Sequence, residues 1–259
     1  MVDIFDIPVY YISFEPVPDL VEELKQVGFN EIHHFKAIDG RKLDPSDLLE
    51  QGLITIRSYD DLMTRRSQNS GLPTTGAVGC TMSHSALWNL CVELNLPYIA
   101  IAEGDLAIRP IDDADKKRIE SILSKPKSVF VSSDPTRFED NAGTVFIGLH
   151  FYIASREACR ILAEKTFPID VQTDFYVSHM GAKKKVNLEG FDVGKWKQHQ
   201  STIQETFCVK CRLPNSTYTY IFVGLGVFVI ILSLLMSLFI VSWKFSHCKR
   251  ELKAYQVGS

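Results

Sequence analysis

GCTMSHSALWNLCVELNLPYIAIAEGDLAI, residues 79–108, passes from a helix-like pattern into a strand-like one and ends beside two acids. The apolar positions of the first part recur at steps of three and four, the spacing of one helix face, in Ala77, Cys80, His84, Leu87, Cys91 and Leu94. Thr74 or Thr75 is the expected N-cap. Residues 98–102 are uniformly apolar and short, which is typical of a strand buried on both faces. A helix leading into such a strand indicates an α/β protein.

The flanking segments continue this alternation. Strands are expected at residues 9–14, 31–38, 129–132 and 144–153, and helices at 20–27, 45–50, 113–124, 155–164 and 170–180, with Asp19 and Ser155 as caps of the first and fourth helices. The rest of residues 41–73 is polar and is expected to be irregular. The sequence therefore predicts one α/β domain with a largely parallel or mixed central sheet.

The overall charge excludes one class of partner. The net charge is −3, and the longest basic run is only Lys183 to Lys185. A nucleic-acid-binding surface usually shows a basic excess gathered on one face, so no nucleic-acid partner is expected. The six cysteines form no disulfide framework, and the pair Cys208 and Cys211 is half of a zinc pattern without a second pair.

The C-terminal part differs in composition from the rest. Residues 213–243 contain no charged side chain, and 220–243 gives 24 mostly apolar positions. At ~1.5 Å per residue this length exceeds the ~30 Å hydrocarbon core of a bilayer. The expected organisation is an α/β domain at 1–207, a juxtamembrane segment at 208–218, a transmembrane helix in the lipid bilayer at 219–243, and a basic tail at 244–259.

The N-terminus predicts the orientation of this span. MVDIFDIPVYYISF has no basic start and no cleavage site, so it does not resemble a signal peptide. This favours a tail-anchored arrangement with the larger domain in the cytosol. Basic residues after the span favour the opposite, so a lumenal orientation stays open.

The two acids at the end of the central strand are the first candidate site. In an extended chain residues i and i+2 point to the same side, so Glu103 and Asp105 aim their carboxylates together. Two close negative charges are commonly neutralised by a divalent cation, and oxygen ligands suit Mg²⁺ or Mn²⁺. A polar turn, with Gly104 supplying the bend, explains the same residues. His84 faces the sheet, either as a hydrogen-bonded core residue or as a ligand.

Several motifs, taken in order, resemble glycosyltransferase family 25, which includes bacterial lipooligosaccharide galactosyltransferases and collagen galactosyltransferases. They are VYYIS (9–13), FKAIDG (35–40), G-C-x-x-S-H-x-x-L-W (79–88) with the strand and acids to 105, GTVFIGLHFYIASREACRIL (143–162), FPIDVQTDFY (167–176) and KQHQSTIQ (197–204). The resemblance covers roughly residues 7–205. It implies a GT-A-like nucleotide-sugar-binding domain and transfer of galactose or glucose from a UDP-sugar to a glycan, glycolipid or protein hydroxyl.

The resemblance also implies residue roles. Glu103 and Asp105 are expected to hold Mn²⁺ or Mg²⁺. Asp174 is the expected catalytic base and Asp170 the second candidate, although both also suit ordinary helix-start acids. Contacts to the donor are expected from Asp39, Gly79, Ser83, His84, Gln200 and Ser201, although Asp39 also suits a simple Asp-Gly turn, and Gln200 and Ser201 a surface.

Two departures from the family pattern favour an alternative. The family usually has E-D-D where this chain has Glu103-Gly104-Asp105. The family also tends to carry an arginine soon after the first strand, whereas the first basic residue after that strand here is Lys25. The alternative is a catalytically degenerate domain that acts as a membrane-anchored binding protein. Restoring the acid with Gly104→Asp is expected to preserve or raise the dependence on Mn²⁺.

Overall fold

The computed structural model describes residues 2–64, 71–133, 135–137, 144–146 and 148–193. A six-stranded sheet forms the centre, in the order β2 (Ile32–Lys36), β1 (Val9–Ser13), β3 (Tyr98–Glu103), β7 (Phe151–Ser155), β4 (Ser128–Val131), β8 (Asn187–Gly190). Strands β1, β2 and β3 are parallel, as are β4 and β8, whereas β7 runs antiparallel to both of its neighbours. The predicted α/β class with a mixed sheet is confirmed.

The antiparallel strand β7 corrects one sequence expectation. A single strand was expected at 144–153, but the chain forms β6 (Thr144–Phe146), which pairs with β5 (Pro135–Arg137) in a separate two-stranded sheet, and then β7. Gly148 lies between them with φ of +83°, a conformation that other residues rarely adopt. The turn at this glycine lets the start of β7 lie beside the end of β3.

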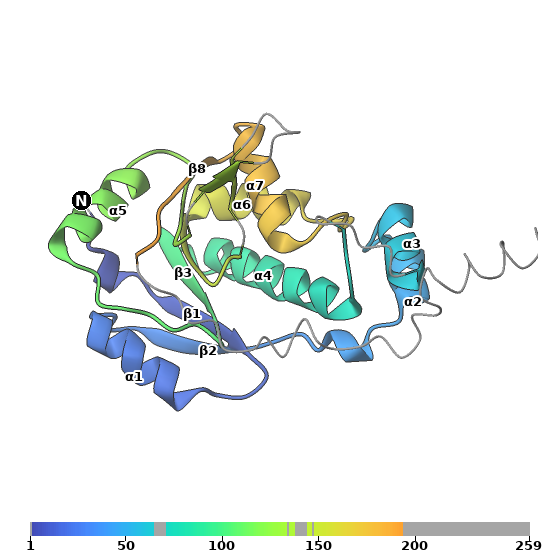
Figure 1. Cartoon of the computed structure of the whole chain (residues 1–259), viewed down its shortest axis with the longest axis horizontal. Helices are drawn as coiled ribbons and strands as arrows, with labels where there is room; N and C mark the ends of the chain where they lie inside the picture. Colours follow the sequence, from blue (N-terminus) through green and yellow to red (C-terminus); the bar gives the residue numbers. More distant parts are fainter. Residues whose placement is uncertain (1, 65–70, 134, 138–143, 147, 194–259) are drawn as a thin grey trace, which may run out of the picture. The chain divides into compact units, whose positions relative to one another are not determined.

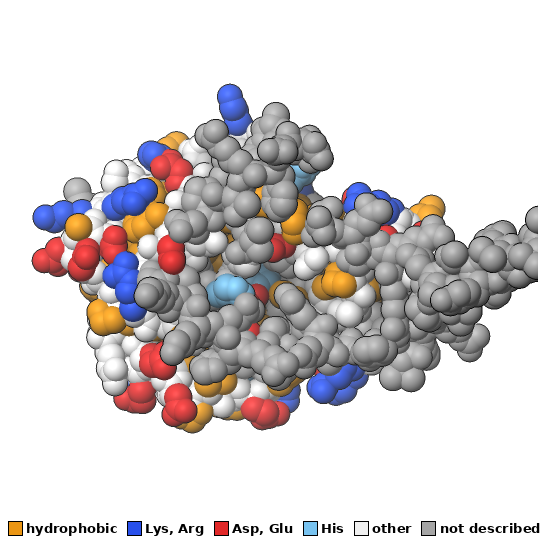
Figure 2. Space-filling model, viewed as in Figure 1, with side chains coloured by type: hydrophobic (Ala, Val, Ile, Leu, Met, Phe, Trp, Pro, Cys, Tyr) orange, Lys and Arg blue, Asp and Glu red, His pale blue; other side chains and the backbone are white. Residues whose placement is uncertain are grey.

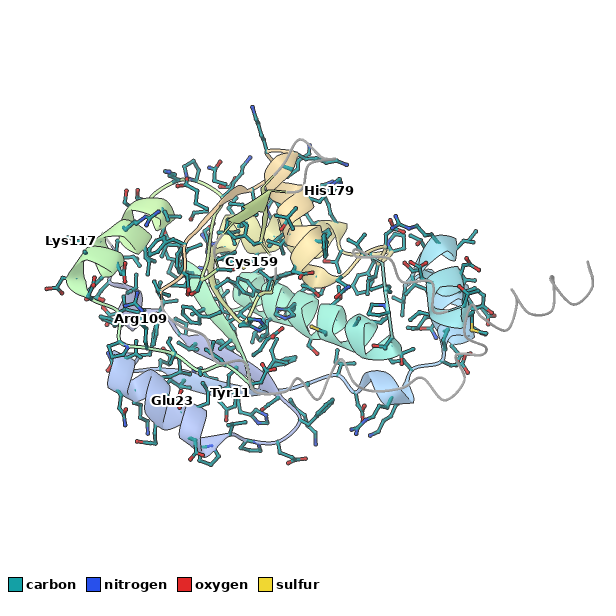
Figure 3. All side chains as sticks on the ribbon, viewed as in Figure 1. Tyr11, Glu23, Arg109, Lys117, Cys159 and His179 are labelled. Carbon is teal, nitrogen blue, oxygen red and sulfur yellow. The ribbon has the colours of Figure 1, made fainter. Side chains whose placement is uncertain are left out.

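Helices cover both faces of the sheet (Figure 1). On one face, α1 (Pro18–Val27), α5 (Asp113–Leu123) and the 3₁₀ turn η1 (Ile4–Asp6) bury Leu24 and Ile119 against Phe130 and Phe151. On the other, α4 (Thr75–Glu93), α6 (Arg156–Lys165) and α7 (Thr173–Ala182) pack on the strands. Figure 3 labels Cys159 of α6 within this second layer. Because side chains alternate along a strand, each strand serves both layers.

Helix α4 is the central element of the second layer. The Thr74 side chain accepts a hydrogen bond from the backbone N–H of Ala77, which confirms the predicted N-cap. A Cβ on Gly79 would lie 2.5 Å from the carbonyl oxygen of Ile38, so only glycine lets these backbones approach so closely. The expected apolar face is wrong at its end, because Leu94 is 54% exposed and follows the last helical residue.

The segment before α4 is more regular than its composition predicts. Helix α2 (Pro45–Glu50) is confirmed, but α3 (Ile56–Thr64) contradicts the irregular structure expected there. Its buried Leu62 packs in a small core with Leu48 and Leu72, so tertiary contacts rather than helix propensity stabilise it.

Several predicted limits also shift. Helix α1 begins at Pro18 after Val17 and has no side-chain cap, so Asp19 is not its cap. By contrast, the predicted cap Ser155 of helix α6 is confirmed, because its side chain accepts a hydrogen bond from the backbone N–H of Ala158. Helix α7 begins at Thr173, so Asp170 precedes it.

Residues 194–259 lie outside the described part of the chain, and with them the predicted transmembrane helix at 219–243. Among the residues that the structure describes, no helix combines the length and apolarity needed to cross a bilayer.

Candidate active site

Glu103, the last residue of β3, lies between two histidines. Its Oε2 accepts a hydrogen bond from His150 Nδ1 at 2.8 Å, and its Oε1 lies 3.8 Å from His84 Nε2. Burial disfavours the charged carboxylate, but the hydrogen bond from His150 and the nearby ring of His84 outweigh it and lower the pKa of Glu103 to about 2. On the side of the molecule that Figure 2 shows, histidine and acidic side chains lie together near the middle. Glu103 is therefore a fixed negative charge.

The pairing of β3 with β7 positions His150. The backbone N–H of Glu103 donates to the carbonyl oxygen of His150 at 2.9 Å, so the end of one strand adjoins the start of the other. The His150 side chain is 22% exposed. Burial lowers its pKa and the Glu103 carboxylate raises it, with a net rise.

A cavity of about 60 Å³ opens beside this pair. It is lined by Ala77, Cys80, Glu103, Asp105, Gly148, Leu149, His150, Gln172, Thr173 and Asp174. A cavity of ~15 Å³ holds one water molecule, so this one has room for a cation with a few waters. The two acids predicted from the sequence, Glu103 and Asp105, both line it.

The donors in this cavity fit a hard divalent cation. Ligand atoms of Glu103, Asp105 and His150 lie within 4.8 Å of one another. A bound cation would replace the hydrogen bond between His150 Nδ1 and Glu103 Oε2. The 2.8 Å separation of these two atoms is close to the roughly 2.9 Å between neighbouring ligands at ~2.0–2.1 Å from an octahedral ion. Two carboxylates suit Mg²⁺ and Mn²⁺, whereas the imidazole is more usual on transition metals.

Asp174 faces the same cavity from the first turn of α7. Its Oδ2 accepts a hydrogen bond from the backbone N–H of Gly148 at 3.1 Å, and its Oδ1 accepts one from Phe175 at 2.8 Å. Burial raises the pKa of Asp174, and the nearby charge of Glu103 raises it further, although the backbone hydrogen bonds oppose the shift. The carboxylate is thus oriented and more basic than an exposed aspartate.

The sequence comparisons match this arrangement. A family model described as "Glycosyltransferase family 25 (LPS biosynthesis protein)" matches residues 20–177. The chain belongs to glycosyltransferase family 25. The match contains Glu103, Asp105, His150 and Asp174, so the whole polar wall of the cavity lies inside the family 25 region.

Individual relatives agree. A Drosophila melanogaster "Glycosyltransferase 25 family member" is 27% identical over 184 residues, covering 62% of this chain and 29% of that protein. "Procollagen galactosyltransferase 1-B" of Xenopus laevis is 29% identical over 119 residues, 44% of this chain and 18% of that protein. A Rattus norvegicus relative called "Probable inactive glycosyltransferase 25 family member 3" is 31% identical over 87 residues, 34% and 14% of the two chains. The chain spans less than a third of each of these relatives.

Two other predicted residues of the family 25 motifs, Gly79 and Ser83, are not among the residues that line the cavity. Ser83 is fully buried, accepts a hydrogen bond from the backbone N–H of Ile38 at 2.9 Å and donates one to the Gly79 carbonyl at 2.8 Å. Gly79 approaches the Ile38 backbone. The structure therefore gives Gly79 and Ser83 a packing role, and donor contacts by them stay predictions.

The acids Asp39 and Asp170 are also outside the cavity lining. Asp39 accepts a hydrogen bond from the backbone N–H of Arg41, and its carboxylate pairs with the Arg41 guanidinium, which lowers the pKa of Asp39. Asp170 accepts a hydrogen bond from Thr55 Oγ1 at 2.6 Å and pairs with Arg57 at 3.3 Å. Asp170 thus ties the segment before α7 to the start of α3, whereas Asp174 reaches the cavity.

Of the two roles that the sequence left open for His84, the structure shows the hydrogen-bonded core residue, and the role of ligand stays a prediction. His84 is a buried core residue whose Nδ1 shares a hydrogen bond with Tyr152 Oη at 2.9 Å, and its Nε2 points toward Glu103. It does not line the cavity itself. Gln200 and Ser201 lie outside the described residues, so their roles stay predictions.

Sequence reasoning missed His150 and Cys80 as cavity residues. His150 stands in the motif at 143–162, just before an apolar run. Only its position before a strand that pairs antiparallel with β3 brings it to Glu103. Cys80 was assigned to the apolar face of its helix, but it lines the cavity, and burial, with the charge of Glu103, raises the pKa of its thiol.

Proposed function

We propose that this family 25 domain is a metal-dependent glycosyltransferase with a GT-A-like architecture, which moves galactose or glucose from a UDP-sugar to a glycan, glycolipid or protein hydroxyl. One observation carries the proposal. Glu103, Asp105, His150 and Asp174 surround a single cavity at the carboxyl end of β3. Ligands of open α/β sheets bind at the carboxyl ends of strands.

The proposed resident cation is Mn²⁺, with Mg²⁺ as the second choice, held by Glu103, Asp105 and His150. When bound, the cation supplies a Lewis acid that stabilises the negative charge gained by the departing UDP. The protein's own contribution is to hold the two carboxylates and the imidazole in place through the β3–β7 pairing. His150 and His84 keep Glu103 ionised for this purpose.

Asp174 is the proposed general base. Inverting transfer requires a group that takes the proton of the acceptor hydroxyl as its oxygen attacks the anomeric carbon. The backbone N–H groups of Gly148 and Phe175 orient its carboxylate, and its raised pKa makes it a stronger base. Asp170 is the weaker candidate because its oxygens bind Thr55 and Arg57.

Release of UDP tests this function. The full chain is incubated with Mn²⁺, a panel of UDP-sugars, and acceptors that include a collagen peptide, since one relative is named a procollagen galactosyltransferase. The expected result is acceptor-dependent release of UDP from UDP-galactose or UDP-glucose. Asp174→Asn is expected to lower the rate by about 100-fold or more, whereas Asp170→Asn retains most of it. No release of UDP from any donor, with or without acceptor, would contradict the proposal.

A binding protein without transferase activity is the second candidate, and Gly104 favours it. A Cβ at this position would lie 2.7 Å from Ser13 Cβ and 2.9 Å from the Ile12 carbonyl oxygen, so the position has no room for the family's middle acid. The melting temperature of the full chain is measured with and without UDP and Mn²⁺. Both the transferase and the binding protein should be stabilised, whereas a domain that binds neither ligand should not. A bound ligand at 100 times its Kd stabilises by ~2.7 kcal/mol. Stabilisation without UDP release would favour the binding protein.

We also propose that residues 219–243 anchor the chain in a membrane, with the α/β domain in the cytosol. The support is the uncharged stretch at 213–243. Resistance to alkaline extraction, lost after truncation at residue 207, tests the anchor. Glycosylation of Asn215, which stands in an N-x-T sequon, would show that this side of the span is lumenal and would contradict the cytosolic orientation.

A further inference from the structure

A second group of metal-ligating side chains meets at Glu103, on the side away from His150. The Cys80 sulfur, a His84 ring nitrogen and a Glu103 carboxylate oxygen lie within 4.8 Å of one another. Cys80 and His84 are four residues apart on α4, so they lie on one face of the helix, one turn apart. This face is directed toward the end of β3.

The free nitrogen of His84 is the observation that distinguishes this group from an ordinary cluster. His84 is fully buried, and its Nε2 has no hydrogen-bond partner. Its Nδ1 shares a hydrogen bond with Tyr152 Oη, which also accepts one from Trp88 Nε1, each at 2.9 Å. A buried polar nitrogen without a partner is costly. It is held in a fixed orientation with Glu103 Oε1 3.8 Å away.

We propose that Cys80, His84 and Glu103 form a binding site for Zn²⁺ that overlaps the proposed manganese site and shares Glu103 with it. Thiolate, imidazole and carboxylate are the three side-chain ligands that zinc takes in proteins. With metal–ligand distances of ~2.0–2.3 Å, tetrahedral ligands lie roughly 3.4–3.8 Å apart. Nitrogen and oxygen ligands fall at the short end of that range, so His84 Nε2 and Glu103 Oε1, which are 3.8 Å apart, need to approach each other by only a few tenths of an ångström.

The surroundings suit this ion. With the Nδ1–H of His84 donated to Tyr152 Oη, Nε2 presents its lone pair to the metal, and the partner fixes the ring as such partners do at zinc sites. Zinc binding releases the proton of the Cys80 thiol, and thiolate and carboxylate then balance the charge of the dication. The adjoining cavity, which Cys80 lines, leaves room for water as the fourth ligand.

The two sites compete for one carboxylate. Glu103 presents Oε1 to His84 and Oε2 to His150. Two dications drawn to one carboxylate repel each other, so zinc and manganese weaken each other's binding, and by linkage equally. If the proposed transferase function is correct, zinc inhibits it. This last consequence rests on the proposed function, whereas zinc binding itself does not.

Cobalt(II) in place of zinc tests the site without any activity measurement. The full chain is used with Cys208, Cys211 and Cys248 changed to serine, so that the cysteines left are Cys80, Cys91 and Cys159. Cobalt(II) is expected to give a thiolate-to-metal charge-transfer band and tetrahedral d–d bands. Stoichiometric Zn²⁺ is expected to displace it.

Matched variants identify the ligands. Cys80→Ser is expected to remove the band and weaken Zn²⁺ binding by about 100-fold, with little change in Mn²⁺ binding. Asp105→Asn is expected to weaken Mn²⁺ and keep the band. Cys91→Ser, at a buried cysteine outside the cavity lining, is the control that keeps both.

Three results would overturn the inference. These are the absence of a thiolate band before mutation, a band that survives Cys80→Ser, and an Mn²⁺ Kd that saturating Zn²⁺ leaves unchanged. The first two refute the zinc site, and the third refutes the shared Glu103. None of them depends on UDP release, so an inactive protein that still binds zinc through Cys80 refutes only the transferase proposal.

Discussion

The two faces of the central sheet are packed by the same alternation of side chains but differ in chemistry. On the α1 and α5 face, residues such as Leu24, Phe130 and Phe151 form a continuous apolar core. On the α4 face, Trp88, Tyr152 and His84 form a buried chain of polar contacts that ends at Glu103. One face thus stabilises the fold, and the other also positions a charged site at the sheet's edge.

Adjacent residues of β7 make this contrast clear. Phe151 and Tyr152 are both fully buried, on opposite faces. Phe151 contributes apolar packing, whereas the hydroxyl of Tyr152 satisfies two ring nitrogens. The difference shows that burial alone does not distinguish a packing residue from one that organises a site. The predictions below test this comparison.

The largest effect is expected for Glu103→Gln on the polar face. Both metal groups contain Glu103, and removal of its charge is expected to weaken Mn²⁺ binding by more than about 100-fold, as measured by calorimetry. Glu31→Gln, at an exposed carboxylate paired with His33, is the matched control and should bind Mn²⁺ normally. Equal Mn²⁺ affinity for Glu103→Gln and the parent protein would remove Glu103 from the site.

On the apolar face, Phe151→Ala is expected to affect stability alone. Loss of a fully buried phenylalanine destabilises by about 3–5 kcal/mol. Urea denaturation measures this loss, and Mn²⁺ affinity at low temperature should stay within about twofold, because Phe151 faces away from the cavity. A large fall in the Mn²⁺ affinity of the folded variant would show that the two faces are coupled.

Gly104→Asp tests whether the end of β1, which approaches Gly104 closely, leaves room for a side chain beside the polar site. The sequence favours retained Mn²⁺ dependence, but the structure places any Cβ there 2.7 Å from Ser13 Cβ and close to backbone. Such overpacking costs about 1–3 kcal/mol or more. We therefore expect a lower urea midpoint and no gain in Mn²⁺ affinity. Gly52→Ala, in open space with φ of +67°, is the control for backbone strain without a clash.

The smallest stability effect is expected for Tyr152→Phe, which leaves buried donors without a partner and costs about 1–2 kcal/mol. Tyr98→Phe removes the hydroxyl that donates to the Leu123 carbonyl at 2.9 Å, and should cost a similar amount. Only Tyr152→Phe should also weaken Zn²⁺ binding, by about 10-fold, because it removes the hydroxyl that holds the His84 ring in its orientation. Equal Zn²⁺ affinity in the two variants would contradict the distinction between the faces.

Local patterns in the sequence predicted much of the fold. Local contacts explain the features that were predicted correctly, because the order of neighbouring residues determines them. These features are the Thr74 cap, helix α4, strand β3 and the Ser155 cap. Helix α3 was missed because its stability comes from Leu48 and Leu72, which lie outside it. The apolar run at 144–153 predicts one strand, because the composition of this run gives no sign of the turn at Gly148.

The same distinction applies to the site. Glu103 and Asp105 were found from their local i, i+2 spacing, and Asp174 because a family motif contains it. The extended chain expected at the two acids is wrong, because β3 ends at Glu103 and Asp105 lies in the turn that follows. Asp170 shares that motif but lies before α7 and binds Thr55, whereas Asp174 lies in the first turn of α7 and faces the cavity. His150 needed the antiparallel register of β7, and the free Nε2 of His84 needed Tyr152 on its other side.

By itself, the sequence determined the α/β class, the central helix and strand, the pair of acids and the family to which they belong. Only the tertiary structure decided which residues surround Glu103, because antiparallel pairing joins segments 47 residues apart and no local pattern records that register. It also decided that Gly104 is required by the close approach of β1 rather than by a turn alone. Spacing along the chain fixes local geometry, whereas contacts between distant segments depend on how the whole core packs.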